Sequence, residues 1–471
     1  MIDSNRRPPD YTLLALVLGL SVFGLVMVYS SSFFIAVNEG HSQTHYLIRQ
    51  LMWMTVGGAG LLVAQRVDYR LWRRLALPLF GTTVGLLILV LMLPESMTRA
   101  GGADRWIRIG GFQFQPTEIA KFALIVYLAA WLMGRGDKLR SMTVGLIPFG
   151  LIVGLLVGIM YAQRNMSSAV MLTLIAVAVY FAAGANLVHI GVGMAGAGSV
   201  GWVLIQSLAH ASARIQVFRD PWADPRGGGF QPIHSLYALA SGSWFGRGLG
   251  QGRQKFLWLP SAHADAIFSV IGEELGLIGT LTVMSAFLLL AYRGYRIAAR
   301  SQDPFAALLA VGITSWITFQ AFLNMAVVSS LIPFTGQTLP FISVGGTSLA
   351  MCLFAMGVLL NISKHVDDQR PEPVVSPVVE RPATSGPRKR RTIGLVPAFA
   401  ALVRRGNRGP RVSGARRSVS FARTNDRQAV AVTDRGWRRL SSSSQRQPKR
   451  SAARKRDRSG SSPSGGTWRS R

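Results

Sequence analysis

The chain has 471 residues, of which 49% are hydrophobic and only 15% are charged, and its mean hydropathy is +0.30. Soluble globular proteins carry about 25% charged residues, so this composition indicates a membrane protein. The single cysteine, Cys352, excludes an intramolecular disulfide framework, a cysteine-based zinc site and a CxxC redox pair. The net charge of +30 requires an explanation of its own.

Positive charge is concentrated at the C-terminal end. Residues 364–471 hold 27 Lys and Arg against seven Asp and Glu, and they are rich in Ser, Pro and Gly. Such a segment buries too little apolar surface to offset the entropy of ordering, so we expect a disordered basic tail. Its charge suits an acidic protein or anionic membrane lipid, and nucleic acid is the least favoured partner. A solvated tail that only fixes orientation is the simpler alternative.

Apolar segments of spanning length recur between residues 13 and 363. A bilayer-crossing helix needs roughly 20 mostly apolar residues. The sequence predicts ten such helices, at 13–35, 46–65, 74–93, 117–133, 142–161, 167–184, 186–206, 266–292, 304–328 and 341–363. The predicted fold class is therefore an all-α polytopic membrane protein.

The distribution of Lys and Arg in the short loops predicts the orientation, because these residues favour the cytoplasmic side. They occur before the first span and after the second, fourth and eighth spans. With an even number of spans, the N-terminal segment 1–12 and the tail 364–471 are both expected in the cytoplasm. The large loop 207–265, between the seventh and eighth spans, is then extracytoplasmic.

Basic residues also occur in the predicted outward loops, where they are normally scarce. Arg105 lies between the third and fourth spans, and Arg214 and Lys255 lie in loop 207–265. An anionic ligand is one explanation for them. The other is that long loops cross the membrane regardless of their charge.

Loop 207–265 has two further features. Glycines occupy alternate positions from Gly246 to Gly252, which suits either phosphate binding by backbone N–H groups or a flexible turn. His263 suits a ligand or a second base, although a solvated loop histidine is the simpler interpretation.

Acidic side chains near or inside predicted spans are candidates for chemistry. Asp265 precedes the eighth span, where a carboxylate can accept a proton, although capping the helix is the commoner role. Glu273 and Glu274 lie deeper in this span and are either functional or paired with a basic residue on another helix. Glu118 and Lys121 share one helical face of the fourth span, as an ion pair or as a polar site facing a cavity.

Four long motifs, taken together and in order, resemble the SEDS (shape, elongation, division and sporulation) family of the FtsW and RodA type. They are RWIRIGGFQFQPTEIAK at 105–121, FRDPWADPRGGGFQ at 218–231, GRGLGQGRQKFLWLPSAHADAIFSVIGEELG at 246–276 and LPFISVGGTSL at 339–349. The resemblance covers residues 10–365 and implies a ten-span glycosyltransferase domain at 13–363, with both termini cytoplasmic. It also implies that the protein polymerises lipid II into peptidoglycan strands at the outer face of the bacterial cytoplasmic membrane and releases undecaprenyl pyrophosphate.

The resemblance assigns roles to individual residues. Asp265 matches the family's essential acid, with general base as the implied role. The residues that match the family's functional and basic positions, and are expected to bind substrate, are Arg105, Trp106, Glu118, Lys121, Arg214 and Lys255. The sequence contains no evident metal-ligand set, but a divalent cation, Mg or Mn, would suit a departing pyrophosphate.

The strings DPWADP and IGEELG are closer to division-type members of the family than to elongation-type members. A division role implies a location at the septum, with a single-pass penicillin-binding transpeptidase and other division proteins as partners. The string Gln163-Arg164-Asn165 departs from the family pattern, which leaves the role of that loop open. The competing hypotheses are an elongation-type polymerase, a lipid II flippase and a non-catalytic scaffold.

Overall fold

The computed structural model of the chain describes residues 8–366, apart from 95–97, 101, 102, 105, 110, 111 and 208. Arg105 and residues 367–471 of the basic tail therefore lie outside the described residues. The expectations stated above for Arg105 and for the tail remain predictions.

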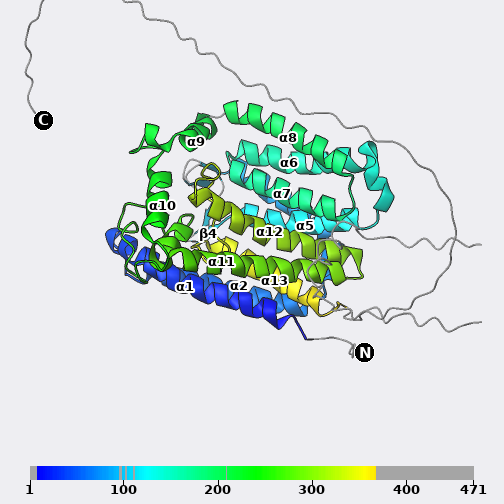
Figure 1. Cartoon of the computed structure of the whole chain (residues 1–471). Coiled ribbons are helices and arrows are strands. Elements are labelled where there is room, and N and C mark those ends of the chain that lie inside the picture. Colours follow the sequence, from blue (N-terminus) through cyan, green and yellow to red (C-terminus); the bar gives the residue numbers. More distant parts are fainter. Residues whose placement is uncertain are drawn as a thin grey trace, which may run out of the picture. The chain divides into compact units, whose positions relative to one another are not determined.

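Helices form most of the described chain, and the longer ones run side by side (Figure 1). The helices are α1 (Tyr11–Asn38), α2 (His45–Arg66), α3 (Arg70–Met92), α5 (Pro116–Leu132), α6 (Ile147–Ala162), α7 (Met166–Ala182), α8 (Leu187–Ser207), α9 (Ala209–Arg219), α10 (Phe230–Ser241), α11 (Ile267–Arg300), α12 (Pro304–Val328) and α13 (Gly346–Ser363). Three short helical turns join them, η1 (Gly136–Arg140), η2 (Met142–Leu146) and η3 (Pro221–Ala223).

Each predicted span coincides with one of these helices. Within the described residues, seven helical segments are long and apolar enough to cross a membrane, judged by length and composition. They comprise α1, α2, α3, η2 with α6, α11, α12 and α13, while α5, α7 and α8 account for the other three predicted spans. The polytopic helical fold is confirmed, and the number of ten crossings stays a prediction.

The connection between α3 and α5, expected only as a loop, contains two small hairpins. Strand β1 (Arg99–Ala100) pairs antiparallel with β2 (Ala103–Asp104), and β3 (Ile107–Ile109) pairs antiparallel with β4 (Phe112–Phe114). Strand β4 lies against α13, so this hairpin is attached to the helical bundle.

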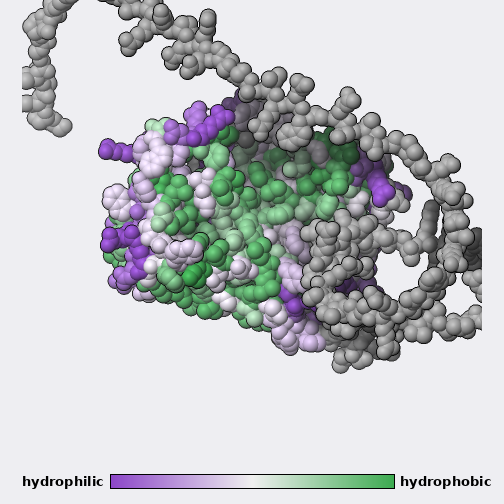
Figure 2. Space-filling view, viewed as in Figure 1, coloured by the Kyte–Doolittle hydropathy of each residue, from purple (hydrophilic) through white to green (hydrophobic). Residues whose placement is uncertain are grey.

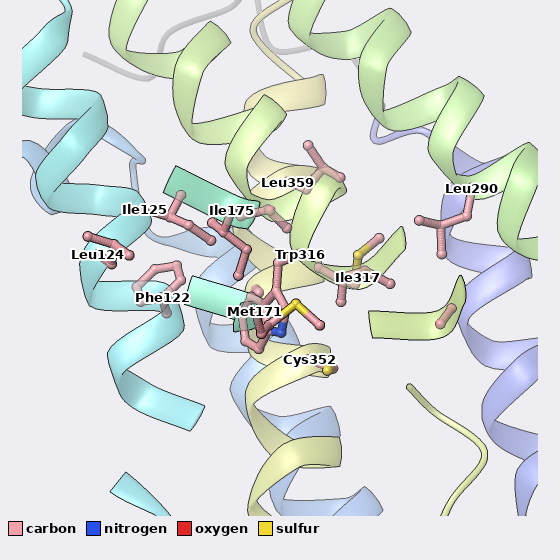
Figure 3. Close-up of a cluster of buried hydrophobic side chains, with 14 of the residues drawn as sticks. Phe122, Leu124, Ile125, Met171, Ile175, Leu290, Trp316, Ile317, Cys352 and Leu359 are labelled. Atoms are coloured by element: carbon pink, nitrogen blue, oxygen red, sulfur yellow. The ribbon is translucent and has the colours of Figure 1, made fainter. Parts of the chain in front are cut away.

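Helix α12 occupies the centre of the bundle, where it packs against α5, α7, α11 and α13. In the most apolar stretch of each candidate span, 83% of the residues are buried in α12 and 72% in α13, against 39% or fewer in the others. Figure 3 shows Phe122 of α5, Met171 of α7, Trp316 of α12 and Cys352 of α13 gathered in this core. The less buried helices present their apolar side chains outward, and Figure 2 shows a broad hydrophobic face between two polar ends. This distribution suits a bilayer around the bundle.

Polar contacts tie together segments at the end predicted to face the cytoplasm. Arg293 of α11 donates two hydrogen bonds to Asp10 Oδ2, at 2.9 Å from Nε and 2.6 Å from Nη2. Asn361 of α13 accepts from the Tyr69 backbone N at 3.0 Å and donates to the Gln65 carbonyl at 2.9 Å. The start of α1 is thus joined to α11, and the turn between α2 and α3 is joined to α13.

Candidate functional site

The Glu118–Lys121 pair of α5 is present and lies inside the bundle. Lys121 Nζ is 2.8 Å from Glu118 Oε1, and both side chains are buried. The same ammonium group donates to Gln320 Oε1 at 2.8 Å and lies 5.3 Å from the centre of the Trp316 ring. Gln320 Nε2 donates in turn to the Thr338 carbonyl at 3.0 Å. The ion pair is therefore connected to the segment between α12 and α13.

Gln320 and Asn324 form a polar stripe along α12 that the sequence analysis did not single out. They are one helical turn apart and are 0% and 1% exposed, respectively. Polar side chains are costly inside an apolar span. Two amides one helical turn apart in segment 304–328 could therefore have identified this stripe from the sequence.

Asp265 lies just before α11 and is held from two directions. Asn324 Nδ2 donates to the Asp265 backbone carbonyl and to the Gln337 carbonyl, each at 2.7 Å. Gln231 Nε2 of α10 donates to Asp265 Oδ1 at 3.4 Å, and the residue is partly buried. Ala266 occupies the N-cap position of α11, so the interpretation of Asp265 as a helix cap is wrong.

A cavity of about 270 Å³ lies beside Asp265, between α9, α10 and the segment that follows α12. Gln231, which hydrogen bonds to the Asp265 carboxylate, also lines this cavity. Arg214 of α9 lines it as well, together with apolar side chains that include Phe218 and Phe334. The cavity combines a basic group and a neighbouring carboxylate with apolar walls.

Arg214 and Asp265 interact electrostatically. Although the Arg214 residue is exposed overall, burial of its guanidinium lowers the pKa of this group, and the Asp265 carboxylate opposes the shift. A guanidinium stays protonated near neutral pH, so the cavity retains a fixed positive charge. Two residues that are 51 positions apart in the sequence are thereby brought to one place.

His263 packs against protein on both sides, and the interpretation of a solvated loop histidine is wrong. Burial lowers the pKa of its imidazole from 6.5 to about 4, while Glu39 acts in the opposite direction. Its ring centre lies 4.4 Å from that of Tyr46, and its carbonyl accepts from the Val344 backbone N at 3.0 Å. His263 is therefore neutral at physiological pH and anchors the segment that leads into Asp265.

Helix α11 is interrupted near its N-terminal end. Gly276 has φ 67° and ψ −164°, which is not helical, and this backbone conformation favours glycine. Beyond the interruption, Leu277 N donates to the Ser243 carbonyl at 2.9 Å and Ile278 N donates to the Trp244 carbonyl at 3.2 Å. Loop residues thus replace the acceptors that a continuous helix would have provided.

The glycine run 246–252 also binds the backbone of α11 at this interruption. Arg247 N donates to the Glu273 carbonyl and Gly248 N to the Glu274 carbonyl, each at 3.0 Å. A Cβ atom at Gly246 would lie 2.1 Å from the Glu274 carbonyl oxygen, so only glycine fits there. Neither a phosphate-binding loop nor a flexible turn describes this part of the loop, because backbone N–H groups of the run bind α11 of the same chain.

Glu274 forms the centre of a buried polar cluster. Its carboxylate accepts from Lys255 Nζ at 2.6 Å, from Gly250 N at 3.0 Å and from Ser30 Oγ of α1 at 2.7 Å. Lys255 is 1% exposed and also donates to Ser30 Oγ and to the Gly250 carbonyl. The expectation of a basic partner on another helix was wrong, since this partner comes from the loop. Contact between Lys255 and a substrate would require this cluster to open first.

Glu273 holds the same loop through backbone groups. Its carboxylate accepts from Arg253 N at 2.7 Å and from Gln254 N at 3.1 Å, and its side chain is buried. The two acids therefore fix two successive parts of the loop onto α11.

Two remaining features of the sequence, Trp106 and the Gln163-Arg164-Asn165 string, make contacts within the described structure. Trp106 is partly buried, and its backbone N donates to the Thr98 carbonyl at 3.2 Å. Gln163 Nε2 donates to the Leu87 carbonyl of α3 at 2.8 Å, and Asn165 caps α7. The Gln163-Arg164-Asn165 string therefore fixes the junction of α3, α6 and α7.

The fold and this site define a multi-pass helical membrane protein with a carboxylate and an arginine at one polar end of the bundle. Residues 11–368 match the family model of the cell cycle proteins FtsW, RodA and SpoVE, and the chain belongs to this family. The probable peptidoglycan glycosyltransferase FtsW of Trichlorobacter lovleyi is 44% identical over 369 residues, covering 77% of this chain and 96% of the relative. Stage V sporulation protein E of Bacillus subtilis is 39% identical over 367 residues, covering 77% of this chain and 99% of the relative.

Solved structures share the fold. A chain from a study of the structural coordination of polymerization and crosslinking by a peptidoglycan synthase complex gives a TM-score of 0.62 at 28% identity, covering 75% of this chain and 97% of that chain. The rod shape determining protein RodA of Thermus thermophilus gives a TM-score of 0.56 at 25% identity, covering 76% and 98%. The resemblance inferred from the four motifs is confirmed.

Proposed function

We propose that the protein is a peptidoglycan glycosyltransferase that polymerises lipid II into glycan strands at the outer face of the cytoplasmic membrane. The FtsW relative at 44% identity supports this activity and supports a role in septal wall synthesis during cell division. The observation that carries the mechanism is the place of Arg214 on the wall of one cavity, with the Asp265 carboxylate bound to Gln231 of the same wall.

Asp265 acts as the general base in this proposal. It takes the proton from the 4-hydroxyl group of the acceptor sugar, whose oxygen attacks the anomeric carbon of the donor sugar. The new glycosidic bond forms as the bond to undecaprenyl pyrophosphate breaks, and the configuration changes from α to β. Much of the rate comes from holding two lipid-anchored sugars in the correct orientation.

Arg214 suits the pyrophosphate end of the donor. A guanidinium forms strong charge-assisted hydrogen bonds to phosphate oxygens, and charge that builds up on the leaving group strengthens them. Gln231 orients the carboxylate through its bond to Oδ1. Arg105 and Trp106, in the neighbouring outward loop, are proposed to extend the substrate-binding surface.

Glu118 and Lys121 act from inside the bundle. Through Gln320 they hold Thr338, in the segment after α12. The same segment supplies Phe334 to the cavity wall, so the ion pair supports the shape of the substrate site.

No step of this proposal is assigned to a divalent cation. Among the described residues, no group of three or more His, Cys, Asp and Glu side chains is arranged to hold a metal ion. These residues do not fit a resident Mg or Mn ion, and none of the steps proposed here passes through one.

A solved relative and the charge of the tail support the proposed partners. A solved relative comes from a complex that coordinates polymerization and crosslinking, which supports a single-pass penicillin-binding transpeptidase as partner. Both termini are proposed to lie in the cytoplasm, where the basic tail would meet an acidic division protein or anionic membrane lipid.

Polymerisation in detergent tests this function. Purified protein incubated with lipid II, with and without the transpeptidase, should form glycan strands, and Asp265→Asn should abolish them. Asp303→Asn is the matched control, because Asp303 caps α12 at the opposite end and Asn is an equally good cap. A flippase would form no strands in detergent but would move lipid II across vesicle membranes. A folded Asp265→Asn variant with normal activity would remove Asp265 as the base.

A further inference from the structure

The outer part of α11, residues 267–275, is fixed independently of the rest of that helix. Gly276 interrupts the helix, and loop backbone groups make the hydrogen bonds at the interruption. Asp265 precedes this short segment, and Glu274 lies at its far end. The position of Asp265 therefore depends on the contacts that hold this segment.

We propose that the Lys255–Glu274 pair is a positioning device for Asp265. The pair fixes the outer segment of α11 and loop 243–256 to α1, and it thereby holds the Asp265 carboxylate at the cavity. This inference rests on the proposed glycosyltransferase function, in which Asp265 is the base. It assigns Lys255 and Glu274 as positioning residues that do not touch the substrate.

The contacts of Lys255 support a positioning role. Its ammonium group has three hydrogens, and three acceptors surround it: Glu274 Oε1 at 2.6 Å, the Gly250 carbonyl at 2.9 Å and Ser30 Oγ at 3.1 Å. The rings of Phe33 and Phe256 lie 5.2 and 5.8 Å from it. The donor capacity of Lys255 is thus used within the protein.

The Glu274 carboxylate joins three parts of the chain. It accepts from Ser30 on α1, from Gly250 in the glycine run and from Lys255 at the end of the loop. With Asn324 bound to the Asp265 carbonyl, the outer segment of α11 is held at both ends.

The burial of both charges makes the pair testable. Removing one partner leaves an uncompensated charge in a buried site, whereas replacing both by neutral groups of similar volume is often close to neutral. We therefore choose Lys255→Met, Glu274→Gln and the double variant. Gln keeps an oxygen that can accept the Gly250 N–H group, and Met preserves the length of the lysine side chain.

Two measurements report on these variants. The first is lipid II polymerisation by the full-length protein, with kcat and KM determined separately. The second is limited digestion by trypsin in detergent, because Arg247 and Arg253 are exposed and flank Gly250 in the loop that the pair holds.

We expect each single variant to lower kcat by at least about tenfold with little change in KM, and to be cut rapidly between residues 247 and 254. The double variant should regain resistance to trypsin and most of the lost kcat. If the single variants do not yield folded protein, Ser30→Ala replaces them and should give a smaller loss of kcat and of trypsin resistance. The double variant is then compared with Ser30→Ala and with the wild type.

A double variant that resists trypsin but stays inactive would overturn the proposal, since Lys255 would then act on the substrate itself. Single variants with normal kcat and normal trypsin resistance would also overturn it. If the proposed function were wrong, the result would differ. The wild type would form no glycan strands, while the single variants would still be cut by trypsin and the double variant would still resist it.

Discussion

Asn324 connects the central helix to the proposed base, and its replacement gives a quantitative test. Asn324→Leu keeps the branched shape of the side chain, although Leu is larger than Asn, and removes the two N–H donors that bind the Asp265 and Gln337 carbonyls at 2.7 Å. Each buried carbonyl left without its donor costs about 1–3 kcal/mol, so we expect a loss of about 2–6 kcal/mol in the free energy of unfolding. Within the described residues, Asn324 Oδ1 has no hydrogen-bond partner, so its removal should cost little.

The effect on activity should exceed the effect on stability. Without Asn324, Asp265 loses a fixed backbone contact, and small displacements of a base greatly reduce the rate. We expect kcat for lipid II polymerisation to fall by at least about 100-fold in a variant that is still folded at the assay temperature. Thermal unfolding in detergent, followed by tryptophan fluorescence, gives the stability of the same preparation.

Asn361→Leu is the matched control. Asn361 also bridges two backbone groups with its side-chain amide, but at the opposite end of the bundle. It should lower the unfolding temperature by a comparable amount and leave kcat nearly unchanged. Equal losses of kcat in the two variants, or a normal kcat in Asn324→Leu, would refute the reasoning that Asn324 positions Asp265.

Three further predictions concern other parts of the structure. Lys121→Met leaves Glu118 charged and buried, which should cost about 3–5 kcal/mol in thermal unfolding, and adding Glu118→Gln should recover most of it; additive losses would contradict a buried pair. His263 has a folded-state pKa of about 4 against an ordinary 6.5, so the unfolded chain binds its proton first as the pH falls. Its contribution is therefore complete above pH 6.5 and decreases by about 2 kcal/mol by pH 5, measured as the difference in unfolding between wild type and His263→Phe; a difference that does not vary with pH would exclude this titration. Gly276→Ala places a Cβ atom 2.4 Å from a loop backbone nitrogen and should destabilise the loop and abolish polymerisation. Gly19→Ala is the control, because its Cβ atom meets nothing within 4 Å and the change should be harmless. An active Gly276→Ala protein would refute the account of the helix interruption.

The sequence was most informative where a property repeats along the chain or lies within one helical turn. Apolar runs located the spans, and the spacing of Glu118 and Lys121 was enough to predict their ion pair. The interruption of α11 was not predictable, because Gly276 in an apolar run resembles any glycine used for close helix packing. The partner of Glu274 was missed for a related reason, since Lys255 approaches it through the fold of the loop and by no helical periodicity.

The cavity near Asp265 could not be predicted either, because its side chains come from distant parts of the sequence. It combines side chains from α9, α10 and the segment after α12, which lie between Ala213 and Phe334 in the sequence. The family resemblance identified Asp265 through its motif and Arg214 through a basic position of the large loop, but the contribution of Asn324 depends on how α12 packs in the centre. Such contacts follow from tertiary packing, which local sequence patterns do not encode.

The two most enclosed of the seven candidate spans, α12 and α13, are also the last of the described helices to be synthesised. During translation the earlier helices enter the bilayer before the helix that fills their common interior exists, so Lys121 waits without Gln320 in a half-assembled protein. Nascent chains that stall before Pro304 should therefore be good substrates for the proteases that remove misassembled membrane proteins. Protection from those proteases would begin only after the ribosome has released the final two helices.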